Sequence, residues 1–253
     1  MRWAKRPARW PPQDARLRGP GGQGGGPRKE AEANKEEQSK AKEKREREGD
    51  RMVTAASAQD TGKLTGKDFI FVALFGLLLF VVFFVFAMIL GMNANTFWFT
   101  HALGAIPGGI VWMYLVARVP KPGAIAAASV VVAVVGLLLG MFWAGPAGIV
   151  VGGVLADAII SLGRRSNAKS IAAFAVWTLC FWLGQQSMVF FAGDAYVDMV
   201  VQSGMSAEYG QALVGFMQSP LIVVAGIACV VGAVVGGVLG AKLFRKHFSK
   251  LAA

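Results

Sequence analysis

From Phe69 onward the chain consists of long apolar runs separated by short polar connections. Six such runs cover residues 69–91, 97–117, 124–142, 147–163, 170–192 and 220–241. Most contain the roughly 20 residues with which an α-helix crosses about 30 Å of hydrocarbon, and 147–163 is the shortest run. The runs lack the alternation typical of strands in a membrane β-barrel. The pattern predicts an all-α integral membrane protein, built as a bundle of six transmembrane helices.

Composition supports lipid as the solvent of this part of the chain. Charged residues make up 16% of the sequence, against about 25% in an ordinary soluble protein. Residues 1–67 hold 17 of the 26 Lys and Arg residues and 10 of the 15 Asp and Glu residues. The remaining charges are too few to cover a water-soluble surface, which excludes a soluble enzyme or a secreted disulfide scaffold. The net charge of +11 is not accompanied by a nucleic-acid recognition module.

The first part of the chain has a different composition. Residues 1–62 are rich in Arg, Gly, Pro, Lys and Glu, which predicts a disordered basic tail before a membrane domain at 63–253. The stretch 43–51 (EKREREGDR) is rich in residues with purine-rich codons and precedes Met52. A translated ribosome-binding sequence has this composition, so one hypothesis is that Met52 is the true start and 1–51 a mis-assigned one. The alternative is a genuine tail that contacts anionic lipid.

Basic residues occupy every second connection between the runs. Those that carry them are Lys63 and Lys67; Arg118 and Lys121; Arg164, Arg165 and Lys169; and Lys242, Arg245, Lys246 and Lys250. The alternate connections, 92–96, 143–146 and 193–219, contain no Lys or Arg. Because cytoplasmic loops are enriched in these residues, the distribution predicts six spans with both termini in the cytoplasm.

Small residues recur at helical spacing and predict close contacts between helices. They are Gly148, Gly152 and Ala156 in the fourth run and Gly232, Gly236 and Gly240 in the sixth. Such faces serve either internal packing or the docking of another membrane subunit. The small residues near the predicted cytoplasmic ends of the first and third runs are candidates for partner docking: Ala73, Gly76, Ala124 and Ala128.

Motifs for catalysis are lacking. The segment 62–68 (GKLTGKD) resembles a phosphate-binding loop but is one residue short between its glycines and has Asp68 in place of the Ser or Thr that binds magnesium. No HExxH, Cys/His or GxSxG motif is present. We therefore expect no catalytic residues, no metal and no cofactor, and an intramembrane enzyme is the least supported class of function.

Polar and aromatic residues gather near the predicted outer face. The candidates for substrate binding are Asn93, Asn95, Trp98, His101, Trp143, Gln185 and Gln186. Tryptophans at this depth also form interfacial belts, which is the alternative role for each of them. Two adjacent glutamines in an apolar helix carry amides that hydrocarbon cannot satisfy, so at least one should face the bundle interior. An aromatic and amide pocket suits a small planar polar nutrient.

Asp157 is the only acidic residue well inside a run. A carboxylate at this depth is costly and should be paired, protonated or turned towards a polar interior. It has either a structural role between helices or a functional one, in proton coupling or ligand contact. The coupling role would fit a stand-alone secondary carrier or channel for a small solute.

Five segments, in this order, carry a resemblance to a known family. They are KLTGKDFIF at 63–71, LGAIPGGI at 103–110, RVPKPG at 118–123, GGVLADAI at 152–159 and GAKLFRKHFSK at 240–250. Together they resemble the MptD, or Trep_Strep, family of S components of energy-coupling-factor (ECF) transporters. The resemblance implies a six-helix bundle of the ECF S-component type in a bacterial cell membrane.

The resemblance also implies function and partners. An S component captures a vitamin or similar micronutrient at the outer face and associates with a transmembrane coupling subunit and two cytoplasmic ATPase subunits. S components often carry an Ala-x-x-x-Ala pair in the first helix for the coupling subunit. Here Ala73 is followed four residues later by Leu77, so that pair is absent, and Ala124 and Ala128 in the third run are the substitute that we expect.

The predicted orientation can be tested by labelling. In the Gln202→Cys variant the new thiol should react with a membrane-impermeant maleimide on intact cells, whereas in Arg164→Cys it should react only after the membrane is opened. The unsubstituted chain is the control because Cys180 and Cys229 lie inside apolar runs. Labelling of both positions from the same side would contradict the orientation.

Overall fold

A computed structural model describes residues 38–44, 63–162 and 165–248, and these residues form helices and short connections. The chain divides into two units, 1–48 and 49–253. In the first unit the described residues, 38–44, form a short exposed helix, although the composition predicted no structure there. The rest of 1–62 lies outside the described residues, so the disordered tail and the start at Met52 stay predictions.

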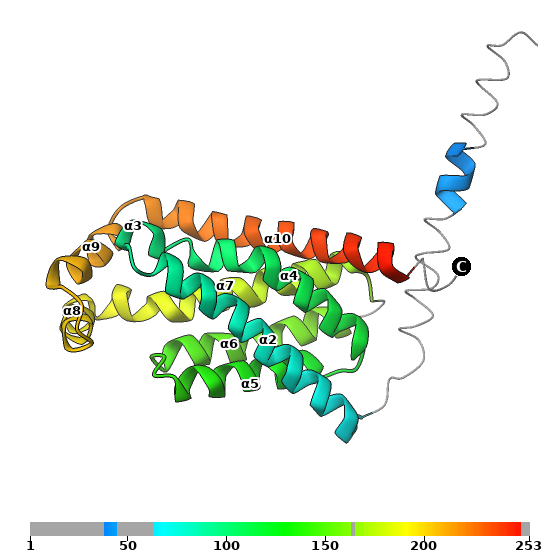
Figure 1. Ribbon diagram of the computed structural model, residues 1–253, viewed down its shortest axis with the longest axis horizontal. Helices are drawn as coiled ribbons and strands as arrows, with labels where there is room; N and C mark the ends of the chain where they lie inside the picture. The colour runs from blue at the N-terminus through cyan, green and yellow to red at the C-terminus, as the bar shows by residue number, and fades with distance from the viewer. Residues whose placement is uncertain (1–37, 45–62, 163–164, 249–253) are drawn as a thin grey trace, which may run out of the picture. The chain divides into compact units, whose positions relative to one another are not determined.

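The membrane unit contains six long helices among the described residues, which confirms the predicted all-helical membrane fold (Figure 1). They are α2 (Gly66–Leu90), α4 (Thr100–Arg118), α5 (Ala124–Leu138), α6 (Ala144–Ser161), α7 (Asn167–Phe191) and α10 (Leu221–Phe248). Three shorter helices lie in the connections: α3 (Ala94–Phe97), α8 (Gly193–Gln202) and α9 (Ala207–Met217). Five of the long helices have the length and composition to cross a membrane, and α5 is the shorter sixth.

Helix α5 ends earlier than its apolar run predicted. The run extends to Phe142, but the helix has 15 residues and a length of about 22 Å. Gly140 adopts a left-handed conformation with φ of 84°, and the N–H groups of Gly140 and Met141 donate to the carbonyls of Leu137 and Gly136. This pair of hydrogen bonds is a Schellman motif, which terminates helices at a glycine. The sequence therefore stops α5 with a glycine that the apolar pattern concealed.

The phosphate-loop-like segment before the first span is a helix cap. The Thr65 N–H and hydroxyl both donate to Asp68 Oδ2 at 2.7 Å, in a capping box that begins α2. Lys121, in the turn between α4 and α5, forms an ion pair with the same oxygen at 2.9 Å, and its side chain is buried. Two of the segments that carry the family resemblance thus bind each other.

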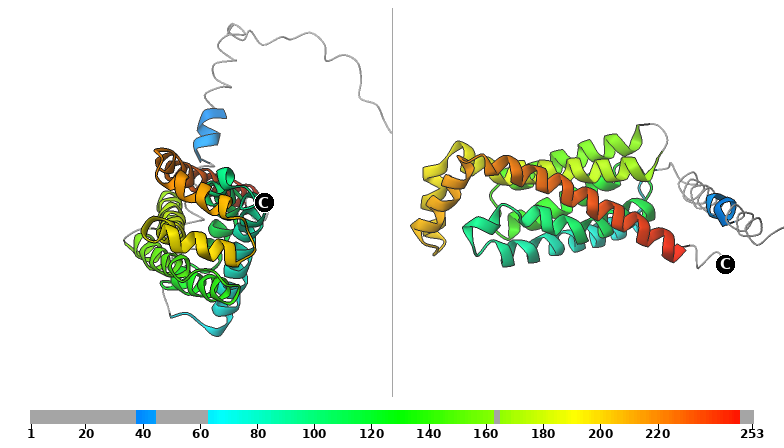
Figure 2. Two further views of the ribbon diagram at one scale, coloured as in Figure 1. Left: turned by 90° about the vertical axis from the view of Figure 1, so that its left-hand side faces the viewer. Right: turned by 90° about the horizontal axis from the view of Figure 1, so that it is seen from above.

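The long helices place their connections at two ends of the bundle (Figures 1 and 2). The start of α2, the α4–α5 connection, the end of α6, the start of α7 and the end of α10 lie at one end. We call it the basic end because the described Lys and Arg residues next to these positions lie there. Helices α3, α8 and α9 lie at the other, which we call the cap end. This division matches the predicted alternation of connections, while the side of the membrane that each end faces stays a prediction.

Helices α4 and α10 touch through their backbones at small residues. A Cβ atom added to Gly232 would lie 2.1 Å from the Ala102 carbonyl oxygen, and one added to Gly236 would lie 2.1 Å from that of Ala105. Helices α6 and α7 meet in the same way, with Gly148 against the Cys180 carbonyl. The glycine spacing noted in the sequence therefore serves packing inside the bundle.

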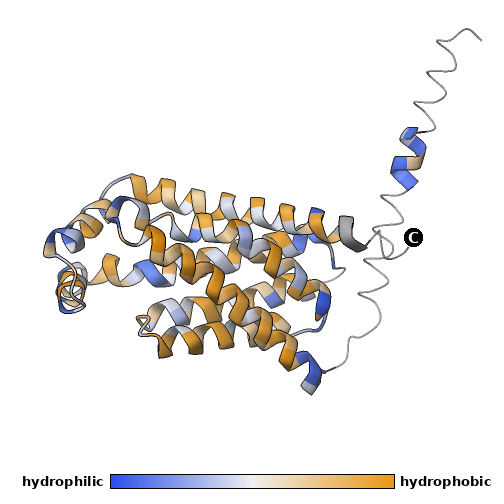
Figure 3. Cartoon of the chain, viewed as in Figure 1, coloured by the Kyte–Doolittle hydropathy of each residue, from blue (hydrophilic) through white to orange (hydrophobic). Residues whose placement is uncertain are grey.

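Large apolar side chains remain exposed along the outside of the bundle. Figure 3 shows that hydrophobic residues predominate along its long helices. Leu74, Leu78 and Met88 of α2 and Val223 and Ile227 of α10 are each more than two-fifths exposed. A surface of this kind would cause aggregation in water but is the ordinary lipid-facing surface of a membrane helix.

A glycine-to-alanine pair tests the close contact of α4 with α10. Gly236→Ala should destabilise the bundle by about 1–3 kcal/mol, because its methyl group has no room beside the Ala105 and Ile106 carbonyls. Gly215→Ala in α9 is the matched control, since nothing lies within 4 Å of its Cβ position. Thermal unfolding in detergent, followed by tryptophan fluorescence, measures both variants. Equal melting temperatures for the two variants would contradict the contact.

Candidate functional site

The structure divides the seven predicted substrate-binding residues into two groups. Four lie inside the bundle near the cap end, and we call them the cap-end cluster: Trp98, His101, Gln185 and Gln186. The other three, Asn93, Asn95 and Trp143, have exposed side chains. Of the seven residues predicted from the sequence, the fold therefore brings four to one end of the bundle interior.

Asn93 and Asn95 belong to the short connection after α2. The Asn93 side-chain oxygen accepts a hydrogen bond from the Asn95 N–H at 2.9 Å and so caps α3. Thr96 donates its hydroxyl to the Leu90 carbonyl at 2.6 Å, which holds the connection against the end of α2. The described contacts of Asn93 are therefore local.

Trp143 lies apart from the cap-end cluster. It precedes α6, its side chain is 66% exposed, and its ring contacts Phe142. An exposed tryptophan at the end of a membrane helix fits the interfacial belt that was the alternative role.

Helices α4 and α7 approach each other through aromatic residues next to the cluster. His101, in the first turn of α4, packs edge-on against Phe181 of α7 with ring centroids 4.4 Å apart. The Trp182 indole donates to the Trp98 carbonyl at 3.3 Å. Residues four apart share a helix face. Gln185 therefore lies one turn along α7 from Phe181, and Gln186 lies one turn along from Trp182.

Each member of the cluster has a buried polar atom without a hydrogen-bond partner. These atoms are Trp98 Nε1, His101 Nε2, Gln185 Oε1 and both amide atoms of Gln186. The three other tryptophans inside the bundle all donate: Trp112 to the Ser170 carbonyl at 3.0 Å, Trp177 to Ser129 Oγ at 2.9 Å, and Trp182 as above. The contrast singles out Trp98 and its neighbours.

Unpartnered buried groups are expensive. Each costs about 1–3 kcal/mol, and native proteins rarely keep several in one region. The side chains of Trp98, His101 and Gln186 are 0%, 6% and 3% exposed, so bulk water does not satisfy them. Gln185 Oε1 lies 3.3 Å from the Cβ position of Gly145, at the start of α6. A polar ligand that enters between α4, α6 and α7 would relieve this cost.

Helix α9 covers the cluster. Phe216 stacks on the Trp98 ring, with centroids 5.0 Å apart and planes at 9°. The Tyr209 hydroxyl donates to the Gly91 carbonyl, which joins α9 to the end of α2. These two contacts cover the bundle above Trp98, so a ligand that reaches Trp98 from this side must displace α9 or the connection beneath it.

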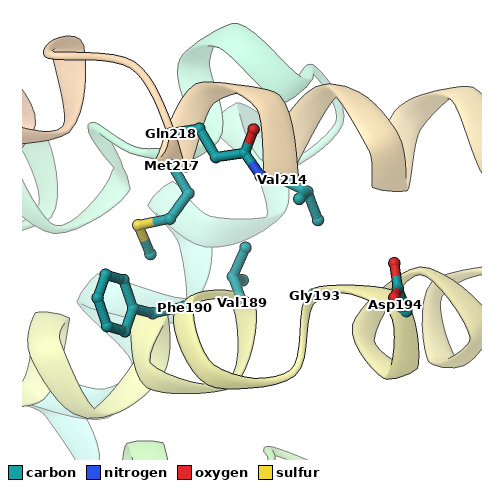
Figure 4. A pocket seen from close by; sticks show the side chains of 7 residues that line it. All are labelled: Val189, Phe190, Gly193, Asp194, Val214, Met217 and Gln218. Carbon is teal, nitrogen blue, oxygen red and sulfur yellow. The ribbon is translucent and has the colours of Figure 1, made fainter.

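A surface hollow of about 330 Å³ lies beside this cover (Figure 4). It is lined by Val189, Phe190, Gly193, Asp194, Val214, Met217 and Gln218, from the end of α7, the start of α8 and α9. None of the cap-end cluster lines it. Because none of the cluster residues reaches it and Asp194 is exposed, the hollow resembles an approach to the cover more than a binding site.

Asp157 of α6 binds the start of α5. Its carboxylate accepts a hydrogen bond from the Ala126 N–H at 2.7 Å and also interacts with the N–H groups of Gly123 and Ile125. These N–H groups begin α5, where the helix dipole favours a negative charge. The geometry agrees with the structural role that was one of its two predicted roles.

The predicted docking residues are mostly inside the bundle. Gly76 of α2 faces the Ala128 backbone of α5, with 3.0 Å from its Cβ position to the Ala128 carbonyl oxygen. Ala124 is 1% exposed and Ala128 is 3% exposed. This internal contact corrects the expectation that Gly76, Ala124 and Ala128 offer a surface, and it leaves Ala73 as the exposed member of the set.

Several residues around the cluster were not singled out from the sequence. Phe83 of α2 and Phe181 of α7 flank His101, and Phe216 and Tyr209 supply the cover. The six apolar runs leave out the connection 193–219, so they predict no membrane span there. Its length and its apolar residues at helical spacing, such as Leu213 and Phe216, were the features that could have indicated packed helices.

Apolar helices of this length, packed through glycines and exposing aliphatic side chains, define a multi-pass α-helical membrane protein. Residues 66–250 match the family described as hypothetical bacterial integral membrane protein (Trep_Strep). The match covers most of the chain, so the protein belongs to this family. No curated protein and no solved structure matches the chain.

Two tyrosines at the cap end, Tyr196 of α8 and Tyr209 of α9, predict a pH dependence. Burial, with a smaller contribution from Tyr209, raises the pKa of Tyr196 to about 12, and burial also raises the pKa of Tyr209. An unfolded tyrosine ionises near pH 10, so between about pH 10 and 12 the unfolded state loses protons that the folded state keeps. The melting temperature should therefore fall across this range, and less steeply in Tyr196→Phe. Identical slopes would mean that Tyr196 ionises freely in the fold.

Proposed function

We propose that this chain is the substrate-binding membrane subunit, or S component, of an ECF-type ABC importer. In this role it captures a vitamin or similar micronutrient at the outer face of the bacterial cell membrane. A transmembrane coupling subunit and two cytoplasmic ATPase subunits supply the energy for uptake. The chain itself binds the solute, catalyses no reaction and uses no cofactor.

The observation that carries this proposal is the unpartnered polar set of the cap-end cluster. Five buried donor or acceptor atoms lie near one end of a lipid-embedded bundle, on α7 and at the start of α4, with Gln185 Oε1 near the start of α6 and Trp98 beneath Phe216 of α9. A site that is mostly apolar with a few convergent polar groups is the usual form of a small-molecule site. In a purely structural bundle these groups would be replaced by apolar ones or paired.

The predicted orientation supports an outer position for this site. The cap end carries the connections without Lys or Arg, and such connections face away from the cytoplasm. Both termini and the basic end then lie on the cytoplasmic side, where the ATPase subunits would act. Solute would enter through the cover formed by α9 and the 91–96 connection.

The rival function, a stand-alone carrier or channel that uses Asp157, has less support. Coupling through a carboxylate requires a group that can exchange protons or bind the solute. The Asp157 carboxylate instead holds the start of α5 through the Ala126 N–H. It also lies on α6 near the basic end, away from the cap-end cluster.

The first test separates an S component from an autonomous carrier. The tagged full chain, purified gently from its native host, should retain the coupling and ATPase subunits. The chain alone in lipid vesicles should bind solute without accumulating it. Accumulation driven by a proton or sodium gradient, with no ATPase present, would favour the carrier.

Docking can be tested on α2. Ala73→Leu should reduce the amount of ATPase subunit retained, because Ala73 is the exposed small residue among the proposed docking residues. Ala87→Leu, also exposed on α2, is the matched control and should retain the wild-type amount. An equal loss in both variants would argue against a docking role for Ala73.

A further inference from the structure

We propose that the ligand of the cap-end cluster is an uncharged planar heterocycle with hydrogen-bond donors and acceptors along its edge, such as a lactam, a cyclic imide or a ring amide. This inference rests on the proposed function, since it names the substrate class of the same site. Three properties of the cluster lead to it: its mixture of donors and acceptors, its lack of charge, and its aromatic walls.

The unpartnered atoms offer both kinds of hydrogen bond. Trp98 Nε1 is a donor only, Gln185 Oε1 is an acceptor only, and Gln186 presents one of each on a single amide. The remaining atom, His101 Nε2, donates or accepts according to its tautomer. Its ring partner Nδ1 lies 3.2 Å from the Thr100 hydroxyl. A ligand that satisfies all of them must itself carry both N–H and C=O groups, as an amide edge does.

The charges of the protein lie elsewhere. Among the described residues, the only charged side chain that is more than nine-tenths buried is Lys121, which is paired with Asp68 at the basic end. The acidic residues near the cap end, Asp194, Asp198 and Glu208, are all exposed. An ammonium group in the cluster would thus be buried without a counter-charge, and a carboxylate or phosphate would have one only if His101 became protonated, so either costs more than burying a neutral amide. The cluster therefore selects an uncharged ligand.

Flat rings border the polar atoms. Phe83 and Phe181 both lie beside His101, with ring centroids at 6.0 and 4.4 Å, and their own centroids are 5.7 Å apart. The Trp98 ring, held by Phe216, closes the side towards the cap end. Aromatic rings stack well against the face or edge of another flat ring. This favours a heterocycle over an open-chain amide.

The test begins with the molecule that the protein itself retains. The full chain is purified in mild detergent without added solute, denatured, and the released small molecules are identified by mass spectrometry and by electrophoretic mobility at pH 7. Two matched probe pairs follow in a binding assay on the same protein: uracil against orotate, and nicotinamide against nicotinate. Within each pair the ring is the same, and the second member carries a carboxylate that the first member lacks.

We expect the released molecule, or the better-bound probe of each pair, to be the uncharged one. Gln186→Leu and Gln185→Leu should each weaken its binding about tenfold or more, as the loss of one buried hydrogen bond implies. Gln202→Leu makes the same chemical change at an exposed position of α8, outside the cover, and should bind as the wild type does. The melting temperature of each variant is measured first, and binding is compared at a temperature well below all three values. Loss of fold is then not mistaken for loss of binding.

The outcomes separate the ligand class from the function. A charged ligand whose binding still depends on Gln185 and Gln186 would overturn the class and leave the site in place. Binding that is indifferent to both glutamines would overturn the class and the site, and with the site the observation that carries the proposed function. If no molecule is released and neither uracil nor nicotinamide binds, the class is wrong, while retention of the ATPase subunits would still support an S component.

Discussion

Backbone contact between helices at glycine positions is the constraint on which the rest of this structure depends. In lipid, burying a leucine against another helix brings little gain, because the hydrocarbon is equally apolar. Helices associate firmly only where their backbones approach, as Gly232 and Gly236 of α10 do against α4 and Gly148 of α6 does against α7. These contacts fix α4 and α7, which carry the histidine and the glutamines of the cap-end cluster.

The cluster opposes this stabilisation. Its five unpartnered atoms each carry a desolvation cost, and they lie where the bundle is closed by the stacked Trp98 and Phe216 rings. A fold under selection for stability alone would replace Gln186 with leucine, which matches its size and suits its surroundings. Two adjacent amides can remain in this mostly apolar helix if a bound solute supplies their hydrogen-bond partners. Stability and binding therefore make opposite demands on the same few side chains.

Sequence periodicity predicted the helices well because lipid imposes a simple rule: about 20 apolar residues make a span. The buried amides were predictable for the same reason, since Gln185 and Gln186 have no water within the hydrocarbon. The features that the sequence did not predict depend on local geometry. The stop of α5 is set by one left-handed glycine, Asn93 caps a helix that no periodicity indicates, and Gly76 faces Ala128 only because of how α2 crosses α5. The packing of α9 on Trp98 is a long-range contact, which no local pattern reports.

The polar contacts at the two ends of α2 have a mechanical consequence. This helix exposes much of its surface to lipid, yet Asp68 ties its first turn to Lys121, while the carbonyls of Leu90 and Gly91 hold Thr96 and Tyr209. Turning α2 about its own axis would break hydrogen bonds at both ends at once, whereas bending it between them would break neither. Any displacement of the first span during a working cycle should therefore take the form of flexure, with its two termini staying in register with their neighbours.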